Sequence, residues 1–343
     1  MALEETLPAR WYGDPEIYRA ERTAVFARTW QLVARAEQLA EPGSSVHAEV
    51  AGFPVVLVHA PGSGLKAFHD VCAHRGGPLA CAGSSFVCGY HGWTYDLDGR
   101  LVRARDFGAD APEGAALRPV AVDVWRGFVF VRLSPSASAG GGPSLLDDLG
   151  GFAGAAADFP MESFRFDGEA VHELRTNWKT YADNYLEGYH IPIVHPELDG
   201  TIDSRRYEVD VHEDGRWVRH HAPARDGSAT TGVWLWRHPN LALNVYPDGM
   251  NVERFLPAGP ARTLVVYWYF FAADADPVGV EESRKLSASL MDEDRAICEA
   301  VQRNLDAGVY DRGPLSPRHE AGVAAFQRWV RDAVDAVEPV DAG

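Results

Sequence analysis

The first part of the chain shows a helical pattern and then a strand pattern. Residues 15–30 carry apolar positions at helical spacing, with Asp14 as a cap and Pro15 at the first helical position. From there to about residue 133, apolar and polar residues alternate in short runs separated by Pro-Gly and Asp-Gly turns. The runs expected to form strands are 46–50, 54–59, 66–70, 86–87, 94–96 and 124–133. We therefore predict a small all-β domain in this half.

The second part of the chain mixes strands with longer helices. Residues 134–143 read Ser-Pro-Ser-Ala-Ser-Ala-Gly-Gly-Gly-Pro, which is typical of a linker or of a mobile insertion within one domain. We expect strands at 169–175, 207–212, 216–222, 232–237, 241–246, 250–256 and 262–272, and helices from 145, at 177–190, 280–305 and 318–337. This order predicts an α+β domain in which a curved sheet grips a long helix.

Composition excludes several classes of protein. The 343 residues are 46% hydrophobic and 24% charged, which suits a globular chain with two cores. A net charge of −17 argues against nucleic acid as a partner. No apolar run approaches the roughly 18 residues of a membrane span, and the first residues lack a signal-peptide pattern. Only four cysteines are present, which argues against a disulfide framework, so we expect a cytoplasmic protein.

Two Cys/His pairs lie in Gly/Pro-rich turns. They are Cys72-x-His74 and Cys88-x-x-His91, and four such ligands can hold one zinc ion or a two-iron cluster. Zinc sites commonly pair like ligands on one element, whereas a Rieske cluster needs two thiolates on one iron and two imidazoles on the other. The Cys-His alternation therefore favours the Rieske cluster. Cys81, between the pairs, is expected to be a small, buried, apolar residue.

A second group of polar residues lies on the predicted helix 177–190. At helical spacing Asp183, Asn184, Glu187 and His190 share one face and aromatic residues share the other, as in any amphipathic helix. His195 follows Pro192, which we expect to turn the chain so that both histidines converge. Two imidazoles and one carboxylate on one side of an iron would form a facial triad.

The carboxylate should come from the helix predicted at 280–305. Asp294 is the lone acid on its apolar stripe, whereas Asp292 falls on the opposite, polar side. A carboxylate carried into a core needs a partner, either a metal ion or a buried Arg or Lys.

These motifs resemble a known family. Cys-x-His-Arg-Gly followed by Cys-x-Tyr-His-Gly-Trp is similar to the Rieske domain of non-haem iron oxygenase α subunits, although the thirteen residues between His74 and Cys88 are fewer than usual there. Asp-Asn-x-x-Glu-x-Tyr-His-x4-His and Glu-Asp-x3-Cys-Glu-x2-Gln are similar to the family's catalytic-iron signature. The resemblance implies a [2Fe-2S] cluster on Cys72, His74, Cys88 and His91, a mononuclear Fe(II) on His190, His195 and Asp294, and Glu187 linking the two sites between subunits.

The resemblance also predicts organisation and partners. We expect an N-terminal helical segment at 1–37 packing on the catalytic domain, a Rieske domain at 38–143 and a helix-grip catalytic domain at 144–343. The family pattern implies a homotrimer that uses O2 and receives NAD(P)H-derived electrons from a separate flavin/iron-sulfur reductase or a ferredoxin, because no flavin or nicotinamide fingerprint is present.

Glu at position 187, residues 240–253 and residues 313–320 resemble the carnitine, choline and glycine-betaine oxygenase branch. This implies hydroxylation or oxidative N-demethylation of a small methylated ammonium compound. The alternatives are an aromatic-ring dioxygenase, a Rieske electron carrier and a zinc-stabilised ligand-binding protein. Aromatic residues on predicted strands could hold a cation by cation–π attraction or simply form sheet core; they are Trp234, Trp236, Tyr246, Trp268 and Tyr269.

Overall fold

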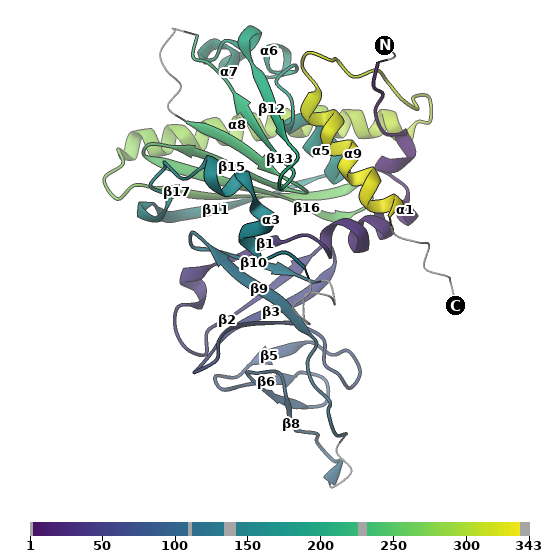
Figure 1. Ribbon diagram of the computed structural model, residues 1–343, viewed down its shortest axis with the longest axis vertical. Helices are drawn as coiled ribbons and strands as arrows, with labels where there is room; N and C mark the ends of the chain where they lie inside the picture. The colour runs from purple at the N-terminus through teal and green to yellow at the C-terminus, as the bar shows by residue number, and fades with distance from the viewer. Residues whose placement is uncertain (1–2, 109–111, 134–141, 226–231, 337–343) are drawn as a thin grey trace. The chain divides into compact units, whose positions relative to one another are not determined.

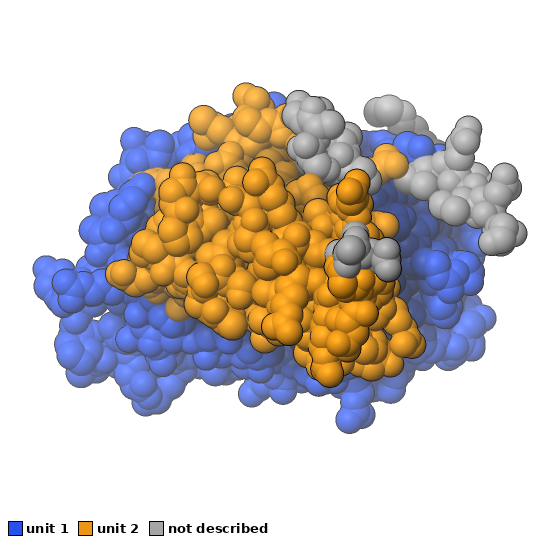
Figure 2. All heavy atoms as spheres, turned by 90° about the horizontal axis from the view of Figure 1, so that it is seen from below, with its two compact units in different colours: residues 1–25, 149–343 blue, residues 26–148 orange. Residues whose placement is uncertain are grey.

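The computed structural model describes residues 3–108, 112–133, 142–225 and 232–336, and the chain divides into two compact units. One unit, here called the inserted unit, comprises Phe26–Asp148. The other, the split unit, comprises Met1–Val25 and Leu149–Gly343. Figure 2 colours the inserted unit orange and the split unit blue. Within the described residues, no helix has both the length and the apolar character needed to cross a membrane.

The inserted unit consists of two antiparallel sheets. The six-stranded sheet has the order β1-β10-β9-β4-β3-β2 and the four-stranded sheet the order β5-β6-β7-β8. The strands are β1 (Gln31–Arg35), β2 (Ser45–Val50), β3 (Phe53–Ala60), β4 (Gly64–His69), β5 (Leu79–Cys81), β6 (Ser85–Cys88), β7 (Thr94–Asp96), β8 (Leu101–Arg103), β9 (Pro119–Trp125) and β10 (Phe128–Arg132). The short helix η3 (Ala36–Leu39) lies between β1 and β2 in sequence, and the short helix α3 (Leu145–Leu149) follows β10.

The turns of this unit explain where its strands end. Gly43, Gly62 and Gly99 adopt positive φ, which confirms the predicted Pro-Gly and Asp-Gly turns. The single strand predicted at 124–133 is wrong, because a turn at Arg126-Gly127, also with positive φ, folds this stretch into the β9–β10 hairpin. No proline or Asn-Gly pair marks that turn. Most of the linker predicted at 134–143 lies outside the described residues.

The split unit is built on a seven-stranded antiparallel sheet with the order β11-β17-β16-β15-β14-β13-β12. Its strands are β11 (Arg165–Leu174), β12 (Glu208–His212), β13 (Trp217–His221), β14 (Val233–Arg237), β15 (Leu241–Tyr246), β16 (Gly249–Gly259) and β17 (Arg262–Phe271). Its helices are η1 (Ala9–Tyr12), α1 (Pro15–Glu21), η2 (Arg22–Phe26), α4 (Gly151–Ala155), η5 (Met161–Ser163), α5 (Trp178–Tyr185), α6 (Ile191–Val194), α7 (Pro196–Thr201), η6 (Ser204–Arg206), α8 (Pro277–Asp306) and α9 (Ala321–Asp335). The predicted α+β class is confirmed.

Helices of the split unit pack on one another and on the sheet. Figure 1 shows α8 and α9 as its long helices, and α5 packs against both of them and against β16. Side-chain caps fix their starts: Asp14 accepts a hydrogen bond from the Glu16 amide, and Asp276 accepts two at the start of α8. The first helix is shorter than the predicted 15–30, because α1 ends at Glu21 and a π-helical turn follows.

The N-terminal segment is part of the split unit. The Thr6 amide donates to the Gly313 carbonyl over 2.9 Å, and the Leu7 amide donates to Gln327 Oε1 over 2.7 Å. Glu21 is completely buried and lies 2.6 Å from Lys179 Nζ on α5. The segment therefore fixes α5 from one side, and α5 leads directly into the candidate iron site.

Candidate functional site

The chain between α5 and α6 places the two predicted histidines. Asn177 caps α5 by accepting from the Lys179 amide over 2.9 Å, but α5 ends at Tyr185, earlier than predicted. At Gly188 a Cβ atom would lie 2.4 Å from the Tyr207 ring, so only glycine fits there. The helix has ended at Tyr185, before His190, and the predicted break at Pro192 is wrong.

Pro192 instead lies in the first turn of α6, where a missing N–H costs nothing. His190 is the N-cap of α6 and His195 its C-cap, so the two histidines flank one short helix. Their ring centroids are 5.0 Å apart with an interplanar angle of 76°. The expected convergence is therefore present, although it arises from a different local structure.

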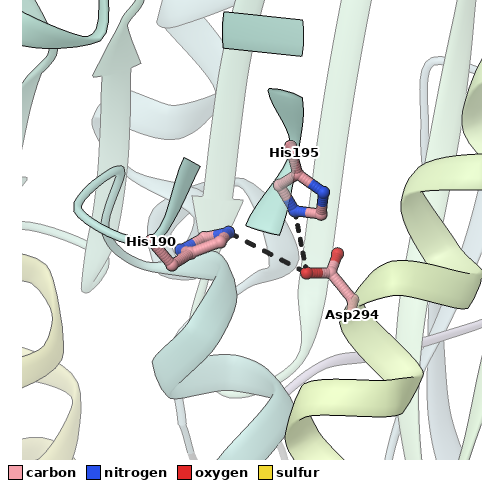
Figure 3. Close-up of side chains that lie close together, drawn as sticks. All are labelled: His190, His195 and Asp294. Carbon is pink, nitrogen blue, oxygen red and sulfur yellow. Dashed lines mark hydrogen bonds and ion pairs between the residues drawn. The ribbon is translucent and has the colours of Figure 1, made fainter. Parts of the chain in front are cut away.

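Asp294 completes a compact group with the two histidines. One ligand atom from each of the three residues lies within 4.8 Å of the others. Figure 3 shows both imidazoles turned toward the same carboxylate oxygen of Asp294 on α8. That oxygen lies 3.0 Å from His195 Nε2 and 3.8 Å from His190 Nε2. The sequence argument for Asp294 over Asp292 agrees with this geometry, because the Asp292 side chain is 69% exposed and pairs with Arg295.

Two further carboxylates orient the imidazoles from behind. His190 Nδ1 lies 2.6 Å from Glu187 Oε1, and His195 Nδ1 lies 2.7 Å from Glu293 Oε2. A carboxylate accepts only, so each Nδ1 carries a proton, and each Nε2 is left to face Asp294. Sequence reasoning missed Glu293, although its place beside Asp294 in the Glu-Asp pair was a usable signal.

The charges of the group fit a cation. Burial lowers the pKa of His195, but Asp294 and Glu293 together outweigh burial and leave that pKa raised. Asp294 also accepts a hydrogen bond from Asn184 Nδ2 over 2.7 Å. Its partners among the described residues are thus imidazoles and an amide. Two imidazole nitrogens and one carboxylate oxygen, each held from behind, form the donor set of a facial-triad iron site.

A cavity of about 230 Å³ opens beside this group. Its aromatic lining residues are Tyr181, Tyr185, Tyr207, Trp234, Tyr246 and Tyr267. Trp234 and Tyr246 were among the predicted candidates. Trp236 instead packs in the core against Phe326 on α9, with ring centroids 5.4 Å apart.

The other two aromatic candidates lie outside the cavity lining. Trp268 donates to Glu169 and stacks under Arg254 at 3.9 Å, and Tyr269 lies under Arg284. Four tyrosines of the lining were missed: Tyr181, Tyr185, Tyr207 and Tyr267. Tyr267 was missed because a strand pattern gives the face of a residue but not its depth along the sheet. Tyr181 and Tyr185 lie on α5, on the face that was expected to form core.

A buried carboxyl group also lines the cavity. Glu253 on β16 is 4% exposed and accepts from Asn244 Nδ2 over 2.8 Å. Burial raises the pKa of Glu253 to about 8, while hydrogen bonds from Tyr267 and Asn244 oppose that rise. His220 lies in the same cavity, and burial lowers its pKa to about 3, so this imidazole is neutral.

The four predicted cluster ligands lie in two equivalent turns of the inserted unit. The Cys72 amide donates to the Gly77 carbonyl and the Gly76 amide donates to the Cys72 carbonyl, over 2.9 and 3.0 Å. Cys88 makes the same pair of bonds with Trp93 and Gly92, over 2.8 and 3.0 Å.

The two turns approach each other closely. A Cβ atom at Gly77 would lie 2.8 Å from Cys88 Sγ, so glycine is required at this point. The repeated turn thus presents the Cys72 and Cys88 thiols from two neighbouring loops.

The atoms of these turns fit a metal cluster. Cys72 and Cys88 are buried, and the His74 and His91 rings lie 4.7 Å apart. Their Nδ1 atoms are buried without a hydrogen-bond partner among the described residues, which would be costly unless a metal binds them. Trp93 stacks on His74 at 4.7 Å. The donor set of two thiols and two imidazoles is that of a Rieske cluster.

Two residues near the turns complete this environment. Tyr95 OH lies 3.1 Å from Cys72 Sγ, within reach of a hydrogen bond that would tune a bound cluster. Cys81 is partly buried and packs against the same core.

Comparison with known proteins identifies both parts of the chain. Residues 29–115 match the Rieske [2Fe-2S] domain, and residues 161–238 and 206–336 match the ring hydroxylating alpha subunit (catalytic domain). Choline monooxygenase of Amaranthus tricolor is 29% identical to this chain, and the match covers 96% of this chain and 78% of that protein. The carnitine monooxygenase oxygenase subunit of Escherichia coli K12 is 32% identical, and the match covers 89% of this chain and 85% of that protein. A solved quaternary ammonium Rieske monooxygenase, described for carnitine oxidation and inter-subunit electron transfer, has a TM-score of 0.82 at 27% identity, covering 96% of each chain.

Proposed function

The chain belongs to the family of Rieske non-haem iron oxygenase α subunits, and we propose which of its residues hold the two metal centres. Cys72, His74, Cys88 and His91 bind the [2Fe-2S] cluster. The mononuclear iron is bound by His190, His195 and Asp294. The observation that carries this assignment is the convergence of His190 Nε2, His195 Nε2 and an Asp294 oxygen within 4.8 Å beside a cavity.

Domain assignment follows from these ligands. The cluster belongs to the Rieske domain at 38–143 and the iron to the catalytic domain at 144–343. Of the N-terminal segment expected at 1–37, residues up to 25 belong with the catalytic domain, whereas residues 26–37 belong to the inserted unit, to whose sheet they contribute β1. Support comes from the compact units, which separate 26–148 from the rest, and from the contacts of Thr6, Leu7 and Glu21 with the split unit.

The metal centres supply one-electron transfer and O2 activation when bound, and the protein positions the substrate. Glu187 and Glu293 hold the imidazole rings through Nδ1 and so fix their tautomer. Tyr185, Trp234 and Tyr246 present aromatic surface to the cavity, which favours a methylated ammonium group. Similar proteins named for choline and carnitine support hydroxylation or N-demethylation of such a substrate.

Glu187 is proposed to couple the two centres across a subunit boundary. Its carboxylate binds His190 Nδ1 and accepts the backbone amides of Tyr189 and His190. Tyr189 and Ile193, which flank His190, are 60% and 85% exposed. Such apolar exposure beside the iron site suits a protein contact, and a homotrimer in which one subunit's cluster docks here would use it.

In this proposal electrons come from a separate reductase. Support comes from similar proteins that are named as the oxygenase subunits of glycine betaine and carnitine monooxygenases. A flavin/iron-sulfur reductase or a ferredoxin would deliver NAD(P)H electrons one at a time. The free Cys72 and Cys88 must stay reduced to bind a cluster, which supports a cytoplasmic location.

The test combines metal analysis with product analysis. Anaerobically purified protein should contain three irons and two acid-labile sulfides per chain, and should give a Rieske electron paramagnetic resonance signal after dithionite reduction. Turnover of choline with a reductase should release an aldehyde from the alcohol or formaldehyde from an N-methyl group. A cis-diol from an aromatic ring would instead support ring dihydroxylation, and two irons without turnover would support an electron carrier.

A further inference from the structure

Glu253 is the carboxyl group of the cavity that the iron site does not use. Glu187 and Asp294 both contact imidazoles, whereas Glu253 accepts from Asn244 Nδ2 at 2.8 Å and from Tyr267. Asn244 is itself fixed, because Tyr185 OH donates to its Oδ1 over 2.7 Å. The carboxyl is thus held rigidly at the wall of the cavity.

The sheet register explains how Glu253 reaches the cavity. On β16 it lies between Ala242 of β15 and Tyr267 of β17. The small Ala242 side chain leaves one side of the carboxyl without a bulky neighbour, while Tyr267 provides a hydroxyl on the other side. Its chain neighbour Arg254 points away, onto Trp268 at 3.9 Å.

No lysine or arginine side chain compensates Glu253 among the described residues of this cavity. Of the described residues that line it, none is lysine or arginine, and the His220 imidazole is neutral. A buried carboxylate normally needs a cationic partner. Here the ligand itself can supply it.

We infer that Glu253 is the counter-charge for the ammonium group of the substrate, and that the cavity selects a monocation such as choline over carboxylated zwitterions such as carnitine. This inference rests on the proposed function. An ammonium group beside Glu253 would also contact the faces of Tyr185, Trp234 or Tyr246, and cation–π attraction would add to the ion pair. A substrate carboxylate would enter a cavity whose described lining holds Glu253 and no basic side chain, so no side chain there would offset the cost of its desolvation.

The protonation of Glu253 gives a second signature. With a pKa of about 8 the empty cavity holds Glu253 largely protonated near neutral pH, and a bound cation would favour the ionised form. The groups that face Glu253 are Tyr181 and Tyr185 on α5, Tyr246 on β15, Tyr267 and Tyr269 on β17, and Asp294 on α8.

Burial raises the pKa of each of these tyrosines, so all of them stay neutral. Binding of a monocation near neutral pH should therefore release a proton from Glu253.

Isothermal titration calorimetry of the holoenzyme tests the inference without turnover. The probes are choline, its neutral isostere 3,3-dimethylbutan-1-ol and L-carnitine, each in two buffers that differ in ionisation enthalpy. Glu253→Gln is compared with wild type and with Glu173→Gln, a matched change at an exposed carboxylate that pairs with Arg262. We expect Glu253→Gln to weaken the binding of choline by at least about tenfold and to abolish the proton release that accompanies it. The affinity for the neutral isostere should not change.

Glu253→Gln can be compared with wild type when it keeps the visible cluster spectrum and the iron content of wild type. If that variant misfolds, the wild-type preference for choline over its isostere and the proton release still test Glu253 as the counter-charge. If wild type and Glu253→Gln bind choline with equal affinity, the role of Glu253 is overturned. If wild type binds carnitine more tightly than choline, the proposed selectivity is overturned. Wild type that binds neither ammonium compound, but binds an aromatic hydrocarbon, refutes the proposed function itself.

Discussion

The substitution Lys179→Met should strongly destabilise the split unit. Lys179 Nζ on α5 lies 2.6 Å from Glu21 Oε1, and both side chains are completely buried. Trp178 Nε1 donates to the other oxygen of Glu21 over 2.9 Å. Methionine has a similar length, so the variant removes the charge and leaves little empty space. It also leaves the Glu21 carboxyl buried with the Trp178 indole as a neutral donor.

The expected loss follows from this burial. Removing one partner of a buried ion pair costs about 3–5 kcal/mol, because the remaining charge is uncompensated.

Urea unfolding followed by circular dichroism measures the loss of unfolding free energy. The control is the double variant Glu21→Gln/Lys179→Met, which removes both charges and should recover most of the stability. A loss below about 1 kcal/mol for Lys179→Met, or a double variant as unstable as the single one, would refute the reasoning.

Three further predictions concern the iron site and its surroundings. Asp294→Ala should remove the mononuclear iron and the activity while keeping the cluster spectrum. Asp292→Ala should change neither the iron content nor the activity, because the Asp292 side chain is 69% exposed. Loss of iron from Asp292→Ala would contradict the assignment of Asp294 as the iron ligand. Glu187→Gln should retain iron yet slow single-turnover oxidation of the reduced cluster by at least about tenfold, whereas an unchanged rate would rule out coupling through Glu187. Burial raises the pKa of Asp183 to about 7, so folding binds a proton there and stability falls as pH rises from about 4 to 7, by on the order of 4 kcal/mol. Asp183→Asn should flatten the plot of melting temperature against pH over this range. An unaltered slope would contradict the proton uptake by Asp183.

The sequence predicted features that depend on local pattern. Alternation located most strands, and helical spacing separated Asp294 from Asp292. The Cys-His alternation indicated the type of cluster because ligand types and their spacing are properties of the chain itself.

Features set by packing were not predictable in the same way. Helix α5 ends at Tyr185, and Gly188 beyond it lies against Tyr207, a contact that no spacing reveals. Pro192 was misinterpreted because a proline is as compatible with the first turn of a helix as with a break. Trp234 and Trp236 share a strand face, yet only Trp234 reaches the cavity, because the helix α9 covers Trp236.

The insertion of residues 26–148 within the split unit has a consequence for synthesis of the protein. Every segment of the inserted unit has been synthesised once residue 148 is made, long before Asp294 and α9, and domains generally fold as units during translation. The N-terminal segment must wait for partners near the other end, since Leu7 and Gln327 are 320 positions apart. Contacts of such separation form slowly. The nascent chain can therefore complete the turns around Cys72 and Cys88 before Asp294 and α9 leave the ribosome, and cluster insertion can precede iron loading.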